Sequence, residues 1–150
     1  MKITFCIDKE RVFDEVAKTT AYVGTMADAY EMISTVDANK DILTSFMESA
    51  CNELMCALGA YNAMADSGDE EEDAMVVTAE VPKSFDMNKR VVITRLMHEY
   101  LTCALIWKWL YMSLPEKGAA WEMKMTEVKG KIVSYMNART AWVKKKMQPF

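Results

Sequence analysis

Two long helical segments joined at a single proline dominate the C-terminal part of the chain and most strongly limit its folds. The first, residues 86–114, carries apolar side chains on nearly every face. The second, residues 116–145, repeats apolar residues at alternating intervals of four and three, which is typical of a helix packed along another helix. Pro115 disfavours a helical conformation in the residue before it and suits the first turn of a new helix. We therefore expect an antiparallel hairpin, with one helix bent at Pro115 as the alternative.

The apolar seam of the second helix leads into a basic tail. The residues of this seam are Trp121, Met125, Val128, Ile132, Tyr135, Arg139 and Trp142. The run Lys144, Lys145 and Lys146 follows, and lysines at a helix end complement the helix dipole. Because the other basic residues are spread along helices, direct contact with DNA is not expected.

The first helix has more apolar surface than one seam requires. A helix that is apolar all round is buried all round, and a domain of 150 residues has difficulty enclosing one. The surplus, which includes Trp107, Trp109, Leu110 and Tyr111, predicts a partner surface, and the simplest partner is another copy. The alternative is a central core helix that its own chain encloses.

Shorter elements are expected in the N-terminal half. Alternation predicts a strand over Lys2–Ile7, and a second strand over Ala74–Val81 is expected to pair with it. Helical spacing predicts three helices, which cover residues 11–23, 25–33 and 39–62. Gly24 is expected to end the first of them.

These elements predict an α+β fold that is mainly α. It combines a small two-stranded sheet, an N-terminal helical region and a long C-terminal antiparallel helical hairpin. We expect one domain over residues 1–150, in which residues 1–64 hold a strand and helices, 65–82 an acidic loop and a strand, and 83–150 the hairpin and basic tail.

Charge is distributed very unevenly along the chain. Residues 1–75 hold 5 basic and 16 acidic side chains, a net −11, whereas residues 76–150 hold 13 basic and 6 acidic ones, a net +7. Such a chain can neutralise itself internally, or it can dock head-to-tail on copies of itself. The acidic loop of residues 69–73 is expected to contact other copies of the chain or partner proteins. Its predicted contact residues are Asp69, Glu71 and Asp73.

Chemistry-bearing motifs are scarce. His98 has no second imidazole or cysteine pair with which to build a zinc site, and neither a nucleophile elbow nor a phosphate-binding glycine loop is present. An EF-hand-like spacing begins at Asp37 but has Ile42 where the turn needs glycine. We therefore predict no enzyme, catalytic residue, metal or cofactor. A carboxylate enzyme is the lowest-ranked reading, and its candidate residues are Glu53, Glu80 and Glu99.

The four cysteines are expected to be reduced and mostly buried, because none form a C-x-x-C pair. We expect no secretory leader at residues 1–8, which carry charges. The near-apolar stretch 100–112 is too short for a membrane span, which needs ~20 residues. No membrane association is expected.

Three segments near the two ends of the chain form a recognisable pattern. They are Lys2–Tyr22 with Val-Phe-Asp-Glu-Val at 12–16, Leu-Ile-Trp-Lys-Trp-Leu at 105–110, and the helix with Trp121 near its start and Arg139 before the basic tail. In these segments the chain resembles small virion proteins encoded by phages and prophages of gut Bacteroidales. The resemblance implies a structural subunit without catalytic residues, built as a ring or stack of identical copies.

The expected function is therefore self-assembly at the head–tail junction (neck or connector) or in the tail of a phage particle. Expected partners are copies of the chain and other virion proteins such as portal or tail proteins. The expected location is the virion, after synthesis in the host bacterial cytoplasm. The alternative is a cytoplasmic helical protein-binding module or regulator with a methionine-rich groove.

Overall fold

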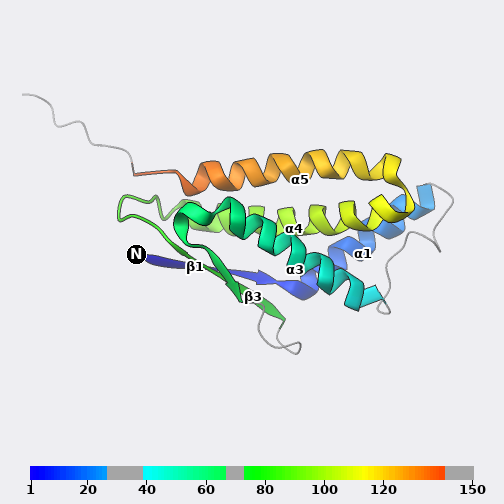
Figure 1. Ribbon diagram of the computed structural model, residues 1–150, viewed down its shortest axis with the longest axis horizontal. Helices are drawn as coiled ribbons and strands as arrows, with labels where there is room; N and C mark the ends of the chain where they lie inside the picture. Colours follow the sequence, from blue (N-terminus) through cyan, green and yellow to red (C-terminus); the bar gives the residue numbers. More distant parts are fainter. Residues whose placement is uncertain (27–38, 67–72, 141–150) are drawn as a thin grey trace, which may run out of the picture.

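A computed structural model describes residues 1–26, 39–66 and 73–140. A layer of helices lies on one face of a small sheet (Figure 1). In chain order the elements are β1 (Lys2–Asp8), α1 (Lys9–Met26), α3 (Lys40–Ala57), the short 3-10 turn η2 (Gly59–Tyr61), β2 (Met64–Asp66), β3 (Ala74–Glu80), α4 (Lys89–Ser113) and α5 (Pro115–Met136).

The two C-terminal helices form the predicted antiparallel hairpin. α4 and α5 lie side by side along most of their length, and the alternative of one bent helix is wrong (Figure 1). Leu114 leaves the helical conformation, with φ −138° and ψ 76°, and Pro115 opens α5. The two helices pack closely at Gly118, where a Cβ would already lie at van der Waals distance, 3.5 Å, from the backbone nitrogen of Tyr111.

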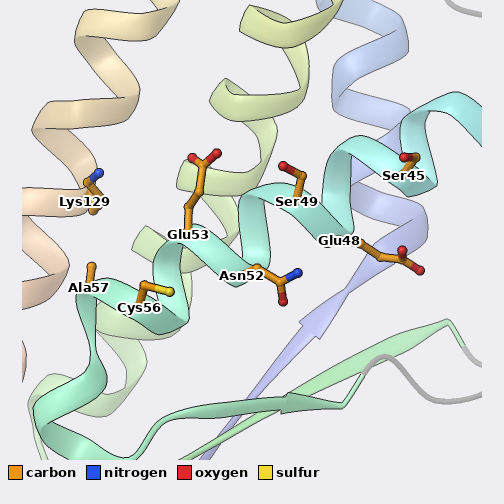
Figure 2. Close-up of a pocket in the computed structure, with 8 residues that line it drawn as sticks. All are labelled: Ser45, Glu48, Ser49, Asn52, Glu53, Cys56, Ala57 and Lys129. Atoms are coloured by element: carbon orange, nitrogen blue, oxygen red, sulfur yellow. The ribbon is translucent and has the colours of Figure 1, made fainter.

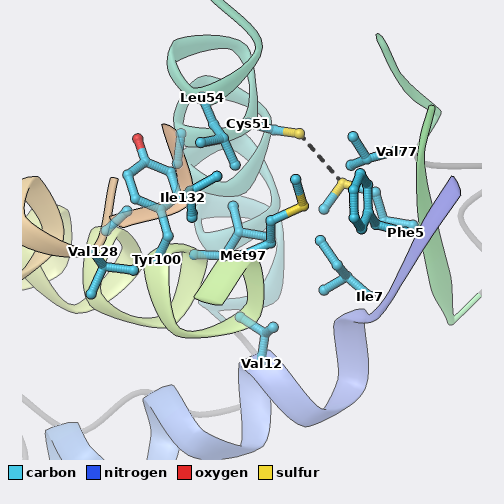
Figure 3. Packing of buried hydrophobic residues seen from close by; sticks show 14 of the residues in the cluster. Phe5, Ile7, Val12, Cys51, Leu54, Val77, Met97, Tyr100, Val128 and Ile132 are labelled. Atoms are coloured by element: carbon cyan, nitrogen blue, oxygen red, sulfur yellow. Dashed lines mark hydrogen bonds between the residues drawn. The ribbon is translucent and has the colours of Figure 1, made fainter. Parts of the chain in front are cut away.

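The core is centred on α4. This helix contacts α1, α3, α5 and β1, and every side chain from Tyr100 to Ile106 is buried. Figure 3 shows Met97 and Tyr100 surrounded by side chains from both helices and strands. Over this stretch the chain itself encloses the helix, as the alternative of a central core helix predicts, whereas Tyr111 among the surplus residues beyond it stays exposed.

The sheet has three antiparallel strands in the order β1-β3-β2. Ile3, Phe5 and Ile7 of β1 face the helices and are buried, and the residues between them are exposed. β3 pairs with β1 as predicted. The third strand, β2, was not predicted, because three exposed residues next to an acidic run carry no alternating pattern.

β1 forms one edge of the sheet, and a side chain blocks part of that edge. Met1 and Lys9 make backbone hydrogen bonds to Val81 and Asp73 at the two ends of the strand pair. Since bonded residues alternate along an antiparallel strand, the carbonyl of Thr4 points away from β3. Arg90 donates a hydrogen bond to it from Nε, at 3.0 Å.

Several predicted boundaries differ from the structure. α1 continues past Gly24, which is one of its buried residues, and ends at Met26. The predicted helix over 25–33 otherwise lies outside the described residues. α3 ends at Ala57, before the expected Asn62, and η2 follows.

α5 also ends early, at Met136, so the predicted continuation to residue 145 is wrong at residues 137–140. Arg139 instead pairs with Phe85 in an isolated β-bridge. The fold class itself, mainly helical α+β with a small sheet and a C-terminal hairpin, is confirmed.

Candidate interaction surfaces

The end of the hairpin exposes large apolar side chains. Tyr111 is 65% exposed and Met112 is 62% exposed, at the C-terminal end of α4. The rings of Trp107 and Tyr111 lie 6.3 Å apart at a tilt of 56°. Trp107 and Trp109 are half-buried, whereas Leu110 is fully buried in the core. Among the predicted contact residues, Tyr111, Trp107 and Trp109 therefore offer surface to a partner, whereas Leu110 does not.

The C-terminal end of α1 reaches the same end of the molecule (Figure 1). α1 packs on α4, to which Glu15 is tied through His98. Tyr22 and Met26 near the end of α1 are 68% and 72% exposed. We call the exposed apolar side chains of the two helix ends the hairpin tip; they are Tyr22, Met26, Tyr111 and Met112. Sequence reasoning missed the first two, although Tyr22 lies off the apolar stripe of α1 and so could have been recognised as exposed.

A groove with a volume of about 810 Å³ lies along the exposed side of α3. Figure 2 shows its lining, which comes from α3 except for Lys129 on α5. The lining residues are Ser45, Glu48, Ser49, Asn52, Glu53, Cys56, Ala57 and Lys129. This described lining is mainly polar and contains no methionine. The expected methionine-rich groove is therefore not found here, and five methionines lie in the core instead.

Lys108 links this groove to the aromatic residues of α4. Its Nζ donates to Ser49 Oγ at 3.2 Å and to Glu53 Oε1 at 3.4 Å, and it lies 5.5 Å from the centre of the Trp107 ring. The lysine side chain is only 16% exposed. The ion pair between Lys108 and the Glu53 carboxylate connects α4 to α3.

The three carboxylates considered for an enzyme do not converge. Glu53 pairs with Lys108, Glu99 pairs with Lys124 at 3.6 Å, and Glu80 accepts a hydrogen bond from Asn62 at 3.1 Å. Within residues 1–26, 39–66 and 73–140, no group of three or more His, Cys, Asp or Glu side chains could hold a metal ion.

His98 joins α4 to α1. Its Nε2 lies 3.0 Å from Glu15 Oε2, and Glu15 also faces Arg11 at 3.6 Å. The imidazole is largely shielded, since its side chain is 17% exposed. This contact connects residues far apart in the sequence, which indicates a role in positioning α1 on the core.

Two of the four free cysteines belong to the core. Burial raises the pKa of Cys103 to about 11 and also raises the pKa of Cys51. The Cys51 thiol lies 3.5 Å from the sulfur of Met75. Since the thiolate is the reactive form, these two side chains stay protonated and inert at neutral pH. Cys6 and Cys56 are exposed.

The other predicted contact residues have mixed positions. Trp121 is half-buried, and the Lys124 ammonium lies over its ring, 5.4 Å from the ring centre. Arg139 donates to the carbonyls of Met136 and Ala138, so it closes the end of α5 rather than extending the seam. The Asp73 side chain is exposed, while its carbonyl accepts from the Lys9 backbone. The remaining residues lie outside the described part; they are Asp69, Glu71, Trp142, Lys144, Lys145 and Lys146.

No helix in the described part of the chain is long and apolar enough to cross a membrane. The chain matches no family model, no curated protein and no solved structure.

Proposed function

We propose that this protein is a structural subunit that associates with copies of itself and with other virion proteins in a phage particle. The observation that carries the self-association is the hairpin tip, where four large apolar side chains of α1 and α4 are exposed at the same end of the molecule. When a partner removes exposed apolar surface from water, the free energy of the system falls, so association is favoured.

The aromatic residues beside the tip strengthen this proposal. Trp107 and Tyr111 form a tilted ring pair that is only partly covered. Aromatic side chains of this kind, with methionines around them, are enriched at the centres of protein interfaces. A partner seated on the tip would complete the burial of both rings.

The placement in a phage neck or tail comes from the resemblance of both chain ends to virion proteins. We propose copies of the chain, and portal or tail proteins, as its neighbours. Mass spectrometry of purified particles, induced from a host that encodes this chain, tests this placement. The chain is expected at several copies per particle, and its absence from intact particles would contradict the proposal.

Self-association is tested by light scattering coupled to gel filtration over a range of protein concentrations. The wild type is expected to form oligomers. The double variant Tyr111→Ser/Met112→Ser is expected to form smaller oligomers than the wild type at the same concentration, because it loses the apolar contact.

A matched control removes equally exposed apolar side chains elsewhere. Met64 and Met123 are 73% and 75% exposed, on β2 and α5. The variant Met64→Ser/Met123→Ser should assemble as the wild type does. A wild type that remains monomeric at every concentration, or a control that loses assembly equally, would rule out the hairpin tip as the contact.

A further inference from the structure

We propose that copies of this chain dock head-to-tail through charged surfaces at opposite ends of the sheet. This inference rests on the proposed self-association and names a second contact, separate from the hairpin tip. The two surfaces are a basic end, where β1 begins, and an acidic corner, where β1 ends.

The basic end gathers positive side chains from segments far apart in the sequence. Met1 pairs with Val81, residues 84–86 bond to residues 138–140, and the Arg90 side chain reaches β1. The basic residues brought together are Lys2, Lys83, Lys89, Arg90 and Arg139. In the described residues around them, the acidic side chains are Glu80 and the half-buried Asp86.

The basic end also has an apolar part. Met87 and Val91, around the start of α4, are 45% and 59% exposed. An apolar centre with charged residues at its rim is the usual anatomy of a protein interface. This favours a protein surface as the occupant.

The acidic corner forms at the other end of β1. Asp8 ends β1, Asp73 bonds through its carbonyl to Lys9, and Asp66 lies opposite Val76 on the neighbouring strand. α3 begins nearby, since Lys40 pairs with Glu10 at 2.8 Å. The acidic side chains of the corner are Asp8, Glu10, Asp41, Asp66 and Asp73. In the described part of this corner they outnumber the basic side chains, which are Lys9, Lys40 and Arg11, and Arg11 faces Glu15 at 3.6 Å.

The two surfaces complement each other but cannot meet within one copy. β1 separates them by about 20 Å, given roughly 3.4 Å per residue of strand. A second copy can instead place its acidic corner on the basic end of the first. Because the two contacting surfaces differ, the contact repeats from copy to copy and produces a ring or an open filament.

Charge reversal at each surface tests this contact. The variant Lys2→Glu/Lys83→Glu makes the basic end acidic, and Asp66→Lys/Asp73→Lys makes the acidic corner basic; all four side chains are exposed. Each variant alone is expected to lose head-to-tail assembly, with a dissociation constant raised about tenfold or more. An equimolar mixture should assemble again, because each reversed surface then finds a complementary one.

Lys129→Glu/Lys131→Glu, in the last two turns of α5, is the control, since it changes the net charge as much as Lys2→Glu/Lys83→Glu. It should assemble as the wild type does. Circular dichroism checks that every variant is folded, and analytical ultracentrifugation measures assembly.

Salt separates this contact from the hairpin tip. At 1 M salt the screening length falls to about 3 Å, so the charged contact weakens, whereas an apolar contact at the tip persists. Failure of the mixture to reassemble would overturn the head-to-tail contact. So would assembly that is equal in the wild type and in both reversed variants, although the tip contact could then still stand.

Discussion

Tyr100 is the largest fully buried side chain of the core, and its hydroxyl has no hydrogen-bond partner among the described residues. Burial, followed by the nearby Glu53 carboxylate, raises its pKa to about 12. A buried polar group without a partner costs about 1–3 kcal/mol. Tyr100→Phe is therefore expected to raise the free energy of unfolding by an amount of this order, as measured by urea denaturation.

Tyr61 provides the contrasting control for this prediction. Its hydroxyl donates a hydrogen bond to the side chain of Asn137, which ties η2 to the end of α5. Tyr61→Phe breaks that bond and should lower the free energy of unfolding by about 0.5–1.5 kcal/mol. A loss of stability in Tyr100→Phe as large as in Tyr61→Phe would contradict our account of the core.

Individual contacts were the least predictable level from sequence. The alternation in Lys2–Ile7 gives the buried face of β1 directly, because successive strand residues point to opposite sides. The covering of α4 was not predictable in the same way. It depends on how many elements converge on that helix, and helical spacing alone does not contain this information.

At the scale of elements, two glycines of α5 differ in their surroundings. A Cβ at Gly130 would meet nothing within 4 Å, whereas one at Gly118 would already touch the backbone of α4. Gly130→Ala should raise the free energy of unfolding by about 0.5–1 kcal/mol, because alanine loses less conformational entropy in a helix. Gly118→Leu should lower it by about 1–3 kcal/mol through overpacking of the hairpin.

Thermal unfolding followed by circular dichroism measures both changes. The two variants lie on the same helix, so a common effect on helix propensity would shift them in the same direction. A melting temperature that falls in Gly130→Ala, or that stays constant in Gly118→Leu, would contradict the packing seen between α4 and α5.

Elements with strong periodicity were predicted well, and their ends were not. The hairpin and the β1–β3 pair follow from the 4-3 spacing, the alternation and Pro115. The prediction that Gly24 ends the helix was wrong. Glycine ends a helix only where the chain turns, and here α1 continues to Met26 with Gly24 as a buried residue. Of the candidate surfaces, the sequence predicted Trp107 and Tyr111, but not Tyr22 or Met26.

At the scale of the whole molecule, α4 connects all layers, so we expect one cooperative unfolding transition. Leu105 is fully buried in α4. Leu105→Ala should lower the free energy of unfolding by about 2–5 kcal/mol. Hydrogen exchange should show the same loss of protection in β3 as in α5. Loss confined to α5 would indicate that the sheet and hairpin unfold separately.

The guanidinium of Arg90 on the outward carbonyl of Thr4 has a consequence for any assembled state. An exposed strand edge can form main-chain hydrogen bonds with a strand of another chain, and such pairing leads to aggregation. At β1 the Arg90 side chain therefore works against this kind of main-chain pairing between molecules.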